Sequence, residues 1–135
     1  MSDDQRLREI LEQSKTIAVL GAHDQPQRAA FYVPEYLRQQ GYRVLPVNPR
    51  LAGLTLFGER VRASLAELGE TVDLLDVFRG ARHLPAHLDE MLAAKPKVVW
   101  FQLGIREDAV AAALTAAGIE VVQDRCTLAD HRRLL

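Results

Sequence analysis

Thr16-Ile17-Ala18-Val19-Leu20 is an unbroken apolar run, and Gly21 ends it. A run without alternation of apolar and polar residues is typical of a strand that is buried on both faces of a parallel sheet. Four more such runs follow at residues 42–47, 72–78, 97–103 and 119–122, the second of these four interrupted by Asp73 and Asp76. The pattern therefore predicts five strands of one parallel sheet.

Helices are predicted before the first strand and between the strands, because apolar residues recur there at helical spacing. The predicted helices cover residues 3–14, 30–40, 84–95, 110–117 and 127–135. Regular alternation of strands and helices predicts an α/β protein with a three-layer, doubly wound, Rossmann-like fold. We expect residues 1–135 to form a single domain.

Three local features refine this prediction. Pro34 is tolerated best in a first helical turn, so the regular helix is expected to start near Val33. Residues 48–62 contain Gly53 and Gly58 and are expected to form a long irregular loop, and such loops are usually functional. Thr127 is expected to be the N-cap of the last helix.

Composition excludes several classes of partner and compartment. The net charge of −1 gives no overall attraction to nucleic acid or to an anionic membrane surface. No apolar run approaches the ~20 residues of a membrane span. The charged N-terminus is unlike a signal peptide, and the single cysteine, Cys126, excludes an internal disulfide. We expect a cytoplasmic protein without nucleic-acid or membrane partners.

Each predicted strand is followed by a turn that carries an arginine. These residues are Arg28, Arg50, Arg79, Arg106 and Arg125. The turns after parallel strands emerge at one edge of the sheet, where ligands bind. Arginine supplies 14 of the 17 basic residues, so the hypothesis rests on this shared edge rather than on any single arginine. Because arginine makes bidentate contacts to phosphate, a phosphate-rich small molecule is the expected ligand.

Two turns narrow the choice of ligand. Residues 21–28 follow the first strand, where nucleotide-binding folds hold a pyrophosphate, but only Gly21 of the dinucleotide fingerprint is present and there is no Walker sequence. The second strand ends in Asn48-Pro49-Arg50, where an NAD-binding fold usually has an acidic residue. Arg50 suits a phosphate on the ribose, which indicates NADP or coenzyme A. Asn48 is able to bond adenine or ribose, and Pro49 keeps the turn extended.

The chain resembles the small stand-alone CoA-binding proteins of the Rossmann type. It is similar to the CoA-binding domain of the succinyl-CoA synthetase α-subunit and of ADP-forming acyl-CoA synthetases. The segments that match are IAVLGA at 17–22, GYRVLPVNPR at 41–50, VDLLDVFR at 72–79, VVWFQLGI at 98–105, and DRC at 124–126 followed by His131. They occur in family order over nearly the whole chain, so the resemblance covers residues 1–135 as one CoA-binding domain.

The resemblance implies four groups of site residues. Those expected to face the phosphates are Gly21, Ala22, His23 and Arg28. Those expected to hold the adenosine end are Asn48, Pro49 and Arg50. A wall along adenine or pantetheine is expected from Val77, Phe78 and Arg79, and the crevice floor from Gln102 and Gly104. The chain departs from the family pattern at His23, where a small hydroxyl residue is usual, and at Ala29-Ala30, which implies weaker phosphate binding or a changed ligand.

No catalytic constellation emerges from the sequence. Cys126 is expected to be a packed, unreactive thiol, although a helix start can favour thiolate. His83 and His87 stand at i, i+4 without a third metal ligand, so they are expected on a helix surface. Asp73 and Asp76, at i, i+3 in a strand, face opposite sides and cannot pair. In the synthetases, as the resemblance implies, the phosphohistidine belongs to a separate domain, which we do not expect within these 135 residues.

The leading hypothesis is a non-enzymatic module that binds coenzyme A or an acyl-CoA as carrier, sensor or thiol protector. One alternative is an NADP-binding, reductase-like protein. Another is a subunit of a split acyl-CoA synthetase that acts with a partner chain. A homodimer, or a complex with an acyl-CoA synthetase subunit, is compatible with these readings.

Overall fold

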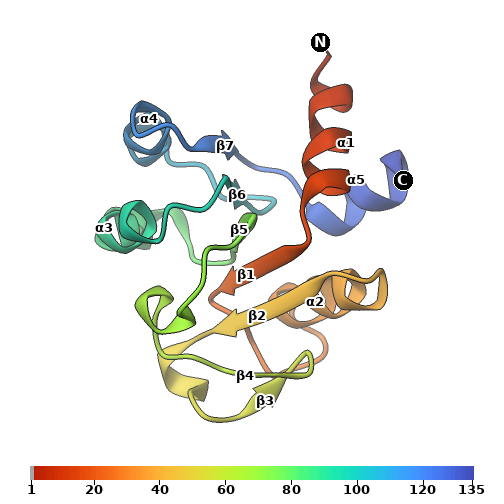
Figure 1. Ribbon diagram of the computed structural model, residues 1–135, viewed down its shortest axis with the longest axis vertical. Coiled ribbons are helices and arrows are strands. Elements are labelled where there is room, and N and C mark those ends of the chain that lie inside the picture. The colour runs from red at the N-terminus through yellow and green to blue at the C-terminus, as the bar shows by residue number, and fades with distance from the viewer. Residues whose placement is uncertain (1) are drawn as a thin grey trace.

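The sheet of the computed structural model, which describes residues 2–135, has the strand order β2-β1-β5-β6-β7 (Figure 1). These strands are β1 (Thr16–Leu20), β2 (Arg43–Val47), β5 (Leu74–Val77), β6 (Val98–Phe101) and β7 (Glu120–Val122). Every neighbouring pair in this sheet is parallel. The predicted α/β fold with a five-stranded parallel sheet is therefore confirmed, although several strands are shorter than their apolar runs.

Helices cover both faces of the sheet. The helices on one face are α1 (Asp3–Gln13), α2 (Ala29–Gln39) and α5 (Thr127–Leu134), and those on the other are α3 (Leu84–Ala94) and α4 (Asp108–Ala116) (Figure 1). Successive strand residues point to opposite faces. In β1, Ile17 and Val19 pack toward α1 and α2, whereas Ala18 and Leu20 pack toward α3. Because both faces are covered, the strand is apolar throughout.

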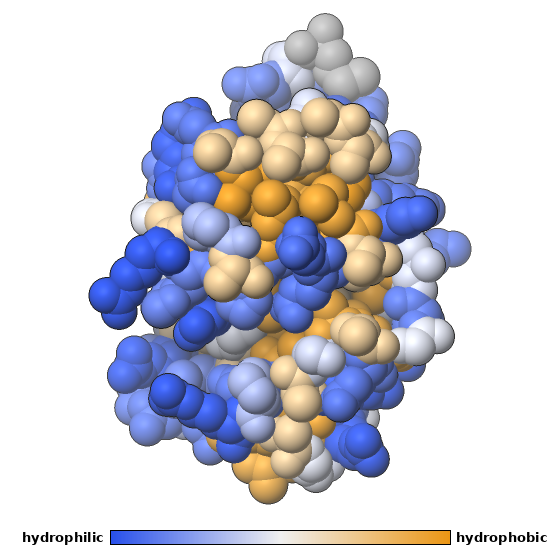
Figure 2. Space-filling model, turned by 90° about the vertical axis from the view of Figure 1, so that its left-hand side faces the viewer, coloured by the Kyte–Doolittle hydropathy of each residue, from blue (hydrophilic) through white to orange (hydrophobic). Residues whose placement is uncertain are grey.

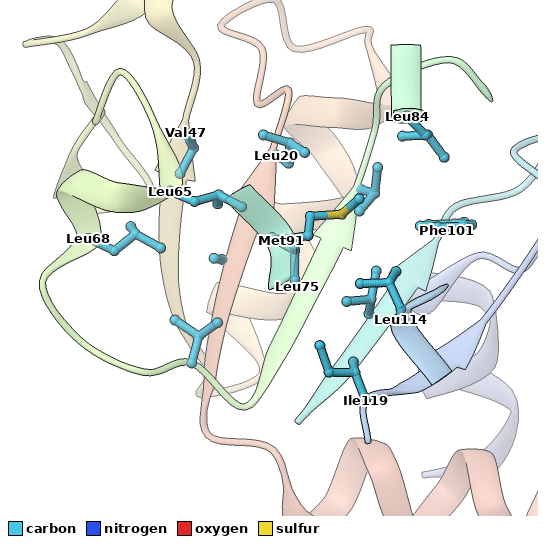
Figure 3. Close-up of a cluster of buried hydrophobic side chains, with 14 of the residues drawn as sticks. Leu20, Val47, Leu65, Leu68, Leu75, Leu84, Met91, Phe101, Leu114 and Ile119 are labelled. Atoms are coloured by element: carbon cyan, nitrogen blue, oxygen red, sulfur yellow. The ribbon is translucent and has the colours of Figure 1, made fainter. Parts of the chain in front are cut away.

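The core beneath α3 and α4 is built from large apolar side chains. Met91 and Leu114 of these helices meet Leu75 of β5 and Phe101 of β6, and all are almost completely buried (Figure 3). Burying each such side chain contributes roughly 1.5–3 kcal/mol, which holds the strand ends rigidly in place. Figure 2 views this side of the molecule and shows apolar surface gathered in its upper half, surrounded by polar side chains.

α2 begins at Ala29 and continues through Pro34, so the expectation that the regular helix starts near Val33 is wrong. Proline has no N–H to donate to the carbonyl oxygen four residues earlier, which belongs to Ala30. The backbone N–H of His23, in the loop after β1, donates to that oxygen instead, at 3.2 Å. The loop thereby supplies the hydrogen bond that the helix lacks, and the two segments are held together.

α5 has Cys126 at its N-cap, so the expectation that Thr127 caps it is wrong. Thr127 is the first helical residue and is fully buried. Its hydroxyl group donates to the carboxylate of Asp76 at 3.0 Å and accepts from the side-chain amide of Gln102 at 2.7 Å. A side chain committed to these partners in the core is not free to cap the helix.

The loop expected at residues 48–62 is more ordered than its composition indicates. It contains the 3₁₀ turn η1 (Pro49–Leu51) and an antiparallel hairpin of β3 (Thr55–Leu56) and β4 (Glu59–Arg60). The segment then returns to β2, where the N–H of Arg62 donates to the carbonyl oxygen of Pro46 at 3.1 Å. It therefore covers the outer edge of β2, which would otherwise be open to pairing with another chain.

The remaining short segments are the 3₁₀ turns η2 (Leu65–Leu68) and η3 (Ala81–His83), which precede β5 and α3 respectively. The two ends of the described chain meet, because Arg133 of α5 bonds Asp4 of α1 at 2.8 Å. No helix within residues 2–135 is both long enough and apolar enough to cross a membrane.

Candidate functional site

A cavity of about 640 Å³ lies at the carboxyl ends of β1, β2 and β5. Its size is that of a small-molecule site. β1 lies between β2 and β5 in the sheet. After β1 the chain forms β2 on one side of it, and the later strand β5 is added on the other side. A change of direction of this kind is the switch point where open α/β sheets bind their ligands.

Most of the predicted site residues line this cavity. They are Gly21, His23, Arg28, Asn48, Pro49, Arg50, Phe78 and Arg79. The cavity is also lined by residues that are not among the predicted site residues, including Asp24, Leu51, His87, and Ala29 and Ala30, which the sequence marks only as a departure from the family pattern. The cavity thus joins the loop after β1, the turn after β2 and the turn after β5 with α3.

Four predicted residues lie outside the cavity wall. Ala22 is fully buried beneath the loop, and Val77 packs in the core under α3. Gln102 is buried and donates to Asp76 at 2.5 Å. Gly104 is exposed after β6 and donates its N–H to the side chain of Asp124 at 2.7 Å. Their expected contacts with a ligand remain predictions.

The loop after β1 is fixed by its own backbone. Gly21 has a φ of +88°, which glycine adopts at little cost, and its N–H donates to the carbonyl oxygen of Val47 at 2.9 Å. The N–H of Ala22 donates to the same oxygen at 3.3 Å, while that of His23 bonds Ala30. These N–H groups therefore anchor the loop and are not free for a ligand.

Free backbone donors are found instead at the start of α2. The N–H groups of Ala29 and Ala30 stand in the first turn, where a helix has no internal acceptor for them. No side chain caps this end, and its first turn contains no acidic residue. Both alanines line the cavity, so the positive end of the helix dipole faces the ligand space. Such an end is a typical place for an anion to bind.

Three of the five turn arginines converge on the cavity. Arg28, Arg50 and Arg79 line it, and within residues 2–135 none of them has a carboxylate oxygen within 4.0 Å. The other two are taken up elsewhere, because Arg106 pairs with Asp108 at 3.1 Å and Arg125 with Asp130 at 2.7 Å. The predicted row of five is therefore a cluster of three, whose charge is available to an anion.

Asn48 connects the turn after β2 to the loop after β1. Its side-chain oxygen accepts the N–H of Arg50 at 2.9 Å, which starts the turn η1. Its side-chain nitrogen donates to the carbonyl oxygen of Ala22 at 2.8 Å. The residue thus fixes the position of Arg50 relative to the loop after β1.

Two histidines stand in the cavity wall. Nδ1 of His23 accepts the N–H of Gln25 at 3.1 Å, so the neutral ring carries its proton on Nε2. His87 contacts Arg79 at 3.3 Å and Glu90 at 3.1 Å. His87 lies on the partly exposed surface of α3, as expected, and it also lines the cavity.

Other reactive groups lie away from the cavity. Cys126 is half-buried against the core on the α1 side. Asp76 is fully buried, and burial raises its pKa to about 7. The described part of the chain contains no group of three or more His, Cys, Asp or Glu side chains able to hold a metal ion.

An open parallel sheet with an arginine-lined cavity at its switch point defines a protein of the nucleotide-binding α/β class. The chain belongs to the CoA binding domain family, whose model matches residues 15–132. The resemblance stated from the sequence is confirmed by this match.

Two similar proteins match nearly the whole chain. The protein YneT of Bacillus subtilis (strain 168) is 33% identical over 125 residues, which cover 93% of this chain and 91% of YneT. A solved structure from Thermus thermophilus, cell-free ID.343, is 58% identical, covers 99% of this chain and 100% of that chain, and has a TM-score of 0.97.

A more distant likeness is to part of a large enzyme. The dinucleotide-forming acetyl-coenzyme A synthetase 1 of Ca. Korarchaeum cryptofilum, solved with phosphate and ADP, is 17% identical with a TM-score of 0.67. The match covers 79% of this chain but 25% of the synthetase chain. At this identity the likeness shows a shared fold alone.

Proposed function

We propose that this protein binds coenzyme A or an acyl-CoA in the cavity at the ends of β1, β2 and β5. One observation carries the proposal. Three arginines without carboxylate partners and the open N-terminus of α2 meet in one cavity of about 640 Å³. The three guanidinium groups outnumber the one carboxylate of the described lining, Asp24, and this excess of positive charge favours a ligand with several phosphates. Membership of the CoA binding domain family supports coenzyme A as that ligand.

The arrangement supports one placement of the ligand. The pyrophosphate fits the N-terminus of α2 with Arg28 and Arg79 beside it, because backbone N–H groups and guanidinium groups bind phosphate oxygens together. Arg50, on the far side of Asn48, is then placed for the ribose phosphate. Leu51 and Phe78 provide apolar surface for the adenine and the pantetheine arm.

The cavity also supports a binding role rather than a catalytic one. Its described lining contains no Ser, Thr, Cys or Lys side chain that could act as a nucleophile. We propose that the isolated chain does not turn over acyl-CoA, and that it acts as carrier, sensor or thiol protector. A role as one subunit of an acyl-CoA synthetase is the second candidate, favoured by the fold shared with that enzyme.

Calorimetric titration tests the proposal. We expect coenzyme A and acetyl-CoA to bind with micromolar affinity, about −7 to −9 kcal/mol. NADPH, which also carries a ribose phosphate, is expected to bind more weakly by at least tenfold. No heat with coenzyme A together with saturable binding of NADPH would overturn the proposal. Mass spectrometry of ligand released from the purified protein checks it independently, and copurification with a synthetase subunit would favour the second candidate.

A further inference from the structure

The side chain of Arg79 runs across the loop after β1. Its Cδ and Cγ atoms would lie 3.2 Å and 3.3 Å from a Cβ atom at Gly21, so the absence of a side chain there gives Arg79 its path. At the end of that path the Nε–H group of Arg79 donates to Nε2 of His87, at 3.3 Å. Its two Nη groups make no hydrogen bond to any residue in the range 2–135.

His87 is itself held from behind. Its Nδ1 atom lies 3.1 Å from a carboxylate oxygen of Glu90, one turn further along α3. A carboxylate only accepts, so Nδ1 carries the proton and Nε2 presents the lone pair that Arg79 requires. Glu90, His87 and Arg79 therefore form a directed chain of hydrogen bonds that ends at the cavity.

We infer that His87, oriented by Glu90, is a positioning residue that holds the guanidinium group of Arg79 ready for a phosphate of the ligand. The inference rests on the proposed function, because it requires a phosphate-bearing ligand in this cavity. His87 acts through Arg79 and needs no contact with the ligand. With Nε engaged, the four N–H bonds of the Nη groups remain for the bidentate contacts that phosphate makes with arginine.

A neutral imidazole suits this task better than a carboxylate. A carboxylate in contact with Arg79 would also hold it, but would cancel much of the positive charge that an anion needs. In the observed chain the carboxylate of Glu90 touches His87 instead, so the compensating charge lies one residue further away. Arg79 is thereby ordered and yet remains without a carboxylate within 4.0 Å in the described chain.

The molecule contains a matched pair outside the cavity. Nε of Arg82 donates to Nε2 of His83, also at 3.3 Å, on the neighbouring turn η3. Neither residue lines the cavity. Substitution of His83 therefore removes the same kind of contact at a residue that does not line the cavity, although His83 is near enough to Arg79 for the charge of that arginine to lower its pKa.

The experiment is a double-mutant cycle on coenzyme A affinity, measured by calorimetry. Ordering one long side chain in advance is worth about twofold to tenfold in affinity, so His87→Leu is expected to weaken binding by that factor. His87→Gln, whose side-chain oxygen can replace Nε2 as acceptor, is expected to keep most of the wild-type affinity for coenzyme A. In the Arg79→Ala background His87→Leu is expected to have no further effect. The control His83→Leu is expected to bind as the wild type does.

Each outcome bears on one proposal in particular. If the wild type binds no coenzyme A, the proposed function fails and this inference fails with it. If the wild type binds but His87→Leu is unchanged, or loses equal affinity with and without Arg79, the inference is overturned while the proposed function stands. Thermal unfolding shows whether each variant is folded. If His87→Leu does not fold, Glu90→Ala replaces it in the double-mutant cycle. Its loss of affinity for coenzyme A must then be present with Arg79 and absent in the Arg79→Ala background.

Discussion

Substitution of Asp76 by asparagine should make the protein more stable at neutral and alkaline pH. The carboxyl group is fully buried on β5, and its partners are the neutral side chains of Gln102 and Thr127, at 2.5 and 3.0 Å. Burial raises its pKa to about 7 from an ordinary 3.8, although both hydrogen bonds act in the opposite direction. Between these two pH values the folded state keeps a proton that the unfolded state releases.

The sign and size of the effect follow from this difference. Because the folded state binds more protons, the free energy of unfolding contributed by Asp76 falls as pH rises from about 4 to about 7, and is constant above. Each pKa unit corresponds to 1.36 kcal/mol, so the loss is about 4 kcal/mol as an upper bound. An asparagine side chain resembles the protonated acid, and the amide of Gln102 can turn to present its oxygen to it, at the loss of the hydrogen bond that Gln102 donates to Thr127. The free energy of unfolding of the variant therefore does not fall in this way as pH rises.

Urea unfolding of the wild type and Asp76→Asn at pH 4.5, 6 and 8 measures the difference. We expect similar stability at pH 4.5 and a growing advantage of the variant toward pH 8. A difference that changes by less than about 1 kcal/mol across this range, or a variant less stable at pH 8, would refute the reasoning. Asp73→Asn is the control, since partial burial raises the pKa of Asp73, but the backbone N–H groups of Lys15 and Thr16 together with the charge of Lys97 lower it by more. That substitution should destabilise the protein near pH 7, and less so at acidic pH.

Three further predictions concern the cavity. Arg50→Ala should lower the affinity for coenzyme A about tenfold to a hundredfold and that for dephospho-CoA much less, since a charge-assisted contact contributes roughly 1.5–3 kcal/mol. Equal losses of affinity in calorimetry would show that Arg50 does not contact the ribose phosphate. Gly21→Ala should lower stability by about 1–3 kcal/mol and reduce binding, because φ is +88° and a Cβ would stand 3.2 Å from the carbonyl oxygen of Phe78; an unchanged melting temperature would contradict this. Pro34→Ala should let the N–H of residue 34 donate to the carbonyl oxygen of Ala30 within α2. The melting temperature should then rise, while the affinity for coenzyme A falls several-fold because His23 loses its bond to the helix. A melting temperature and an affinity that both rise or both fall would count against a link between helix and loop.

The strands could be predicted because their chemistry is local. A sheet covered by helices on both faces requires apolar residues at every strand position, and unbroken runs show this directly in the sequence. Strand ends could not be placed as well, since they depend on hydrogen bonds made by neighbours. Asp73, for example, lies just before β5, although its N–H donates to the carbonyl oxygen of Thr16 and its carbonyl oxygen accepts the N–H of Val98.

Part of the candidate site could be predicted for a similar reason. Arginines in turns after parallel strands share an edge whatever the details of packing, which brought Arg28, Arg50 and Arg79 into one prediction. That rule does not say which arginines find a carboxylate partner. Arg125 follows β7 in the same manner, yet α5 begins at once and brings Asp130 within 2.7 Å of it.

The residues that sequence reasoning missed act through partners distant in the chain. His87 carries no motif, and its spacing from His83 pointed to a helix surface. Its place in the cavity exists because the turn after β5 sends Arg79 back over Gly21 toward α3. Gln102 is a different case, since its buried side chain donates to Thr127 and lies outside the cavity lining, so its expected contact with a ligand remains a prediction.

Pro34 connects these observations to function. A proline inside a helix leaves one carbonyl oxygen without its usual N–H donor. The sequence alone shows that this donor is missing, but not which group replaces it. Here the N–H of His23 replaces it, so the loop that precedes α2 is tied to the second residue of that helix. The N–H groups of Ala29 and Ala30 are thereby kept at the cavity in a fixed position relative to Gly21. A residue that weakens the helix by itself thus orders the N-terminal end of the helix, the part of the fold on which the proposed coenzyme A site depends.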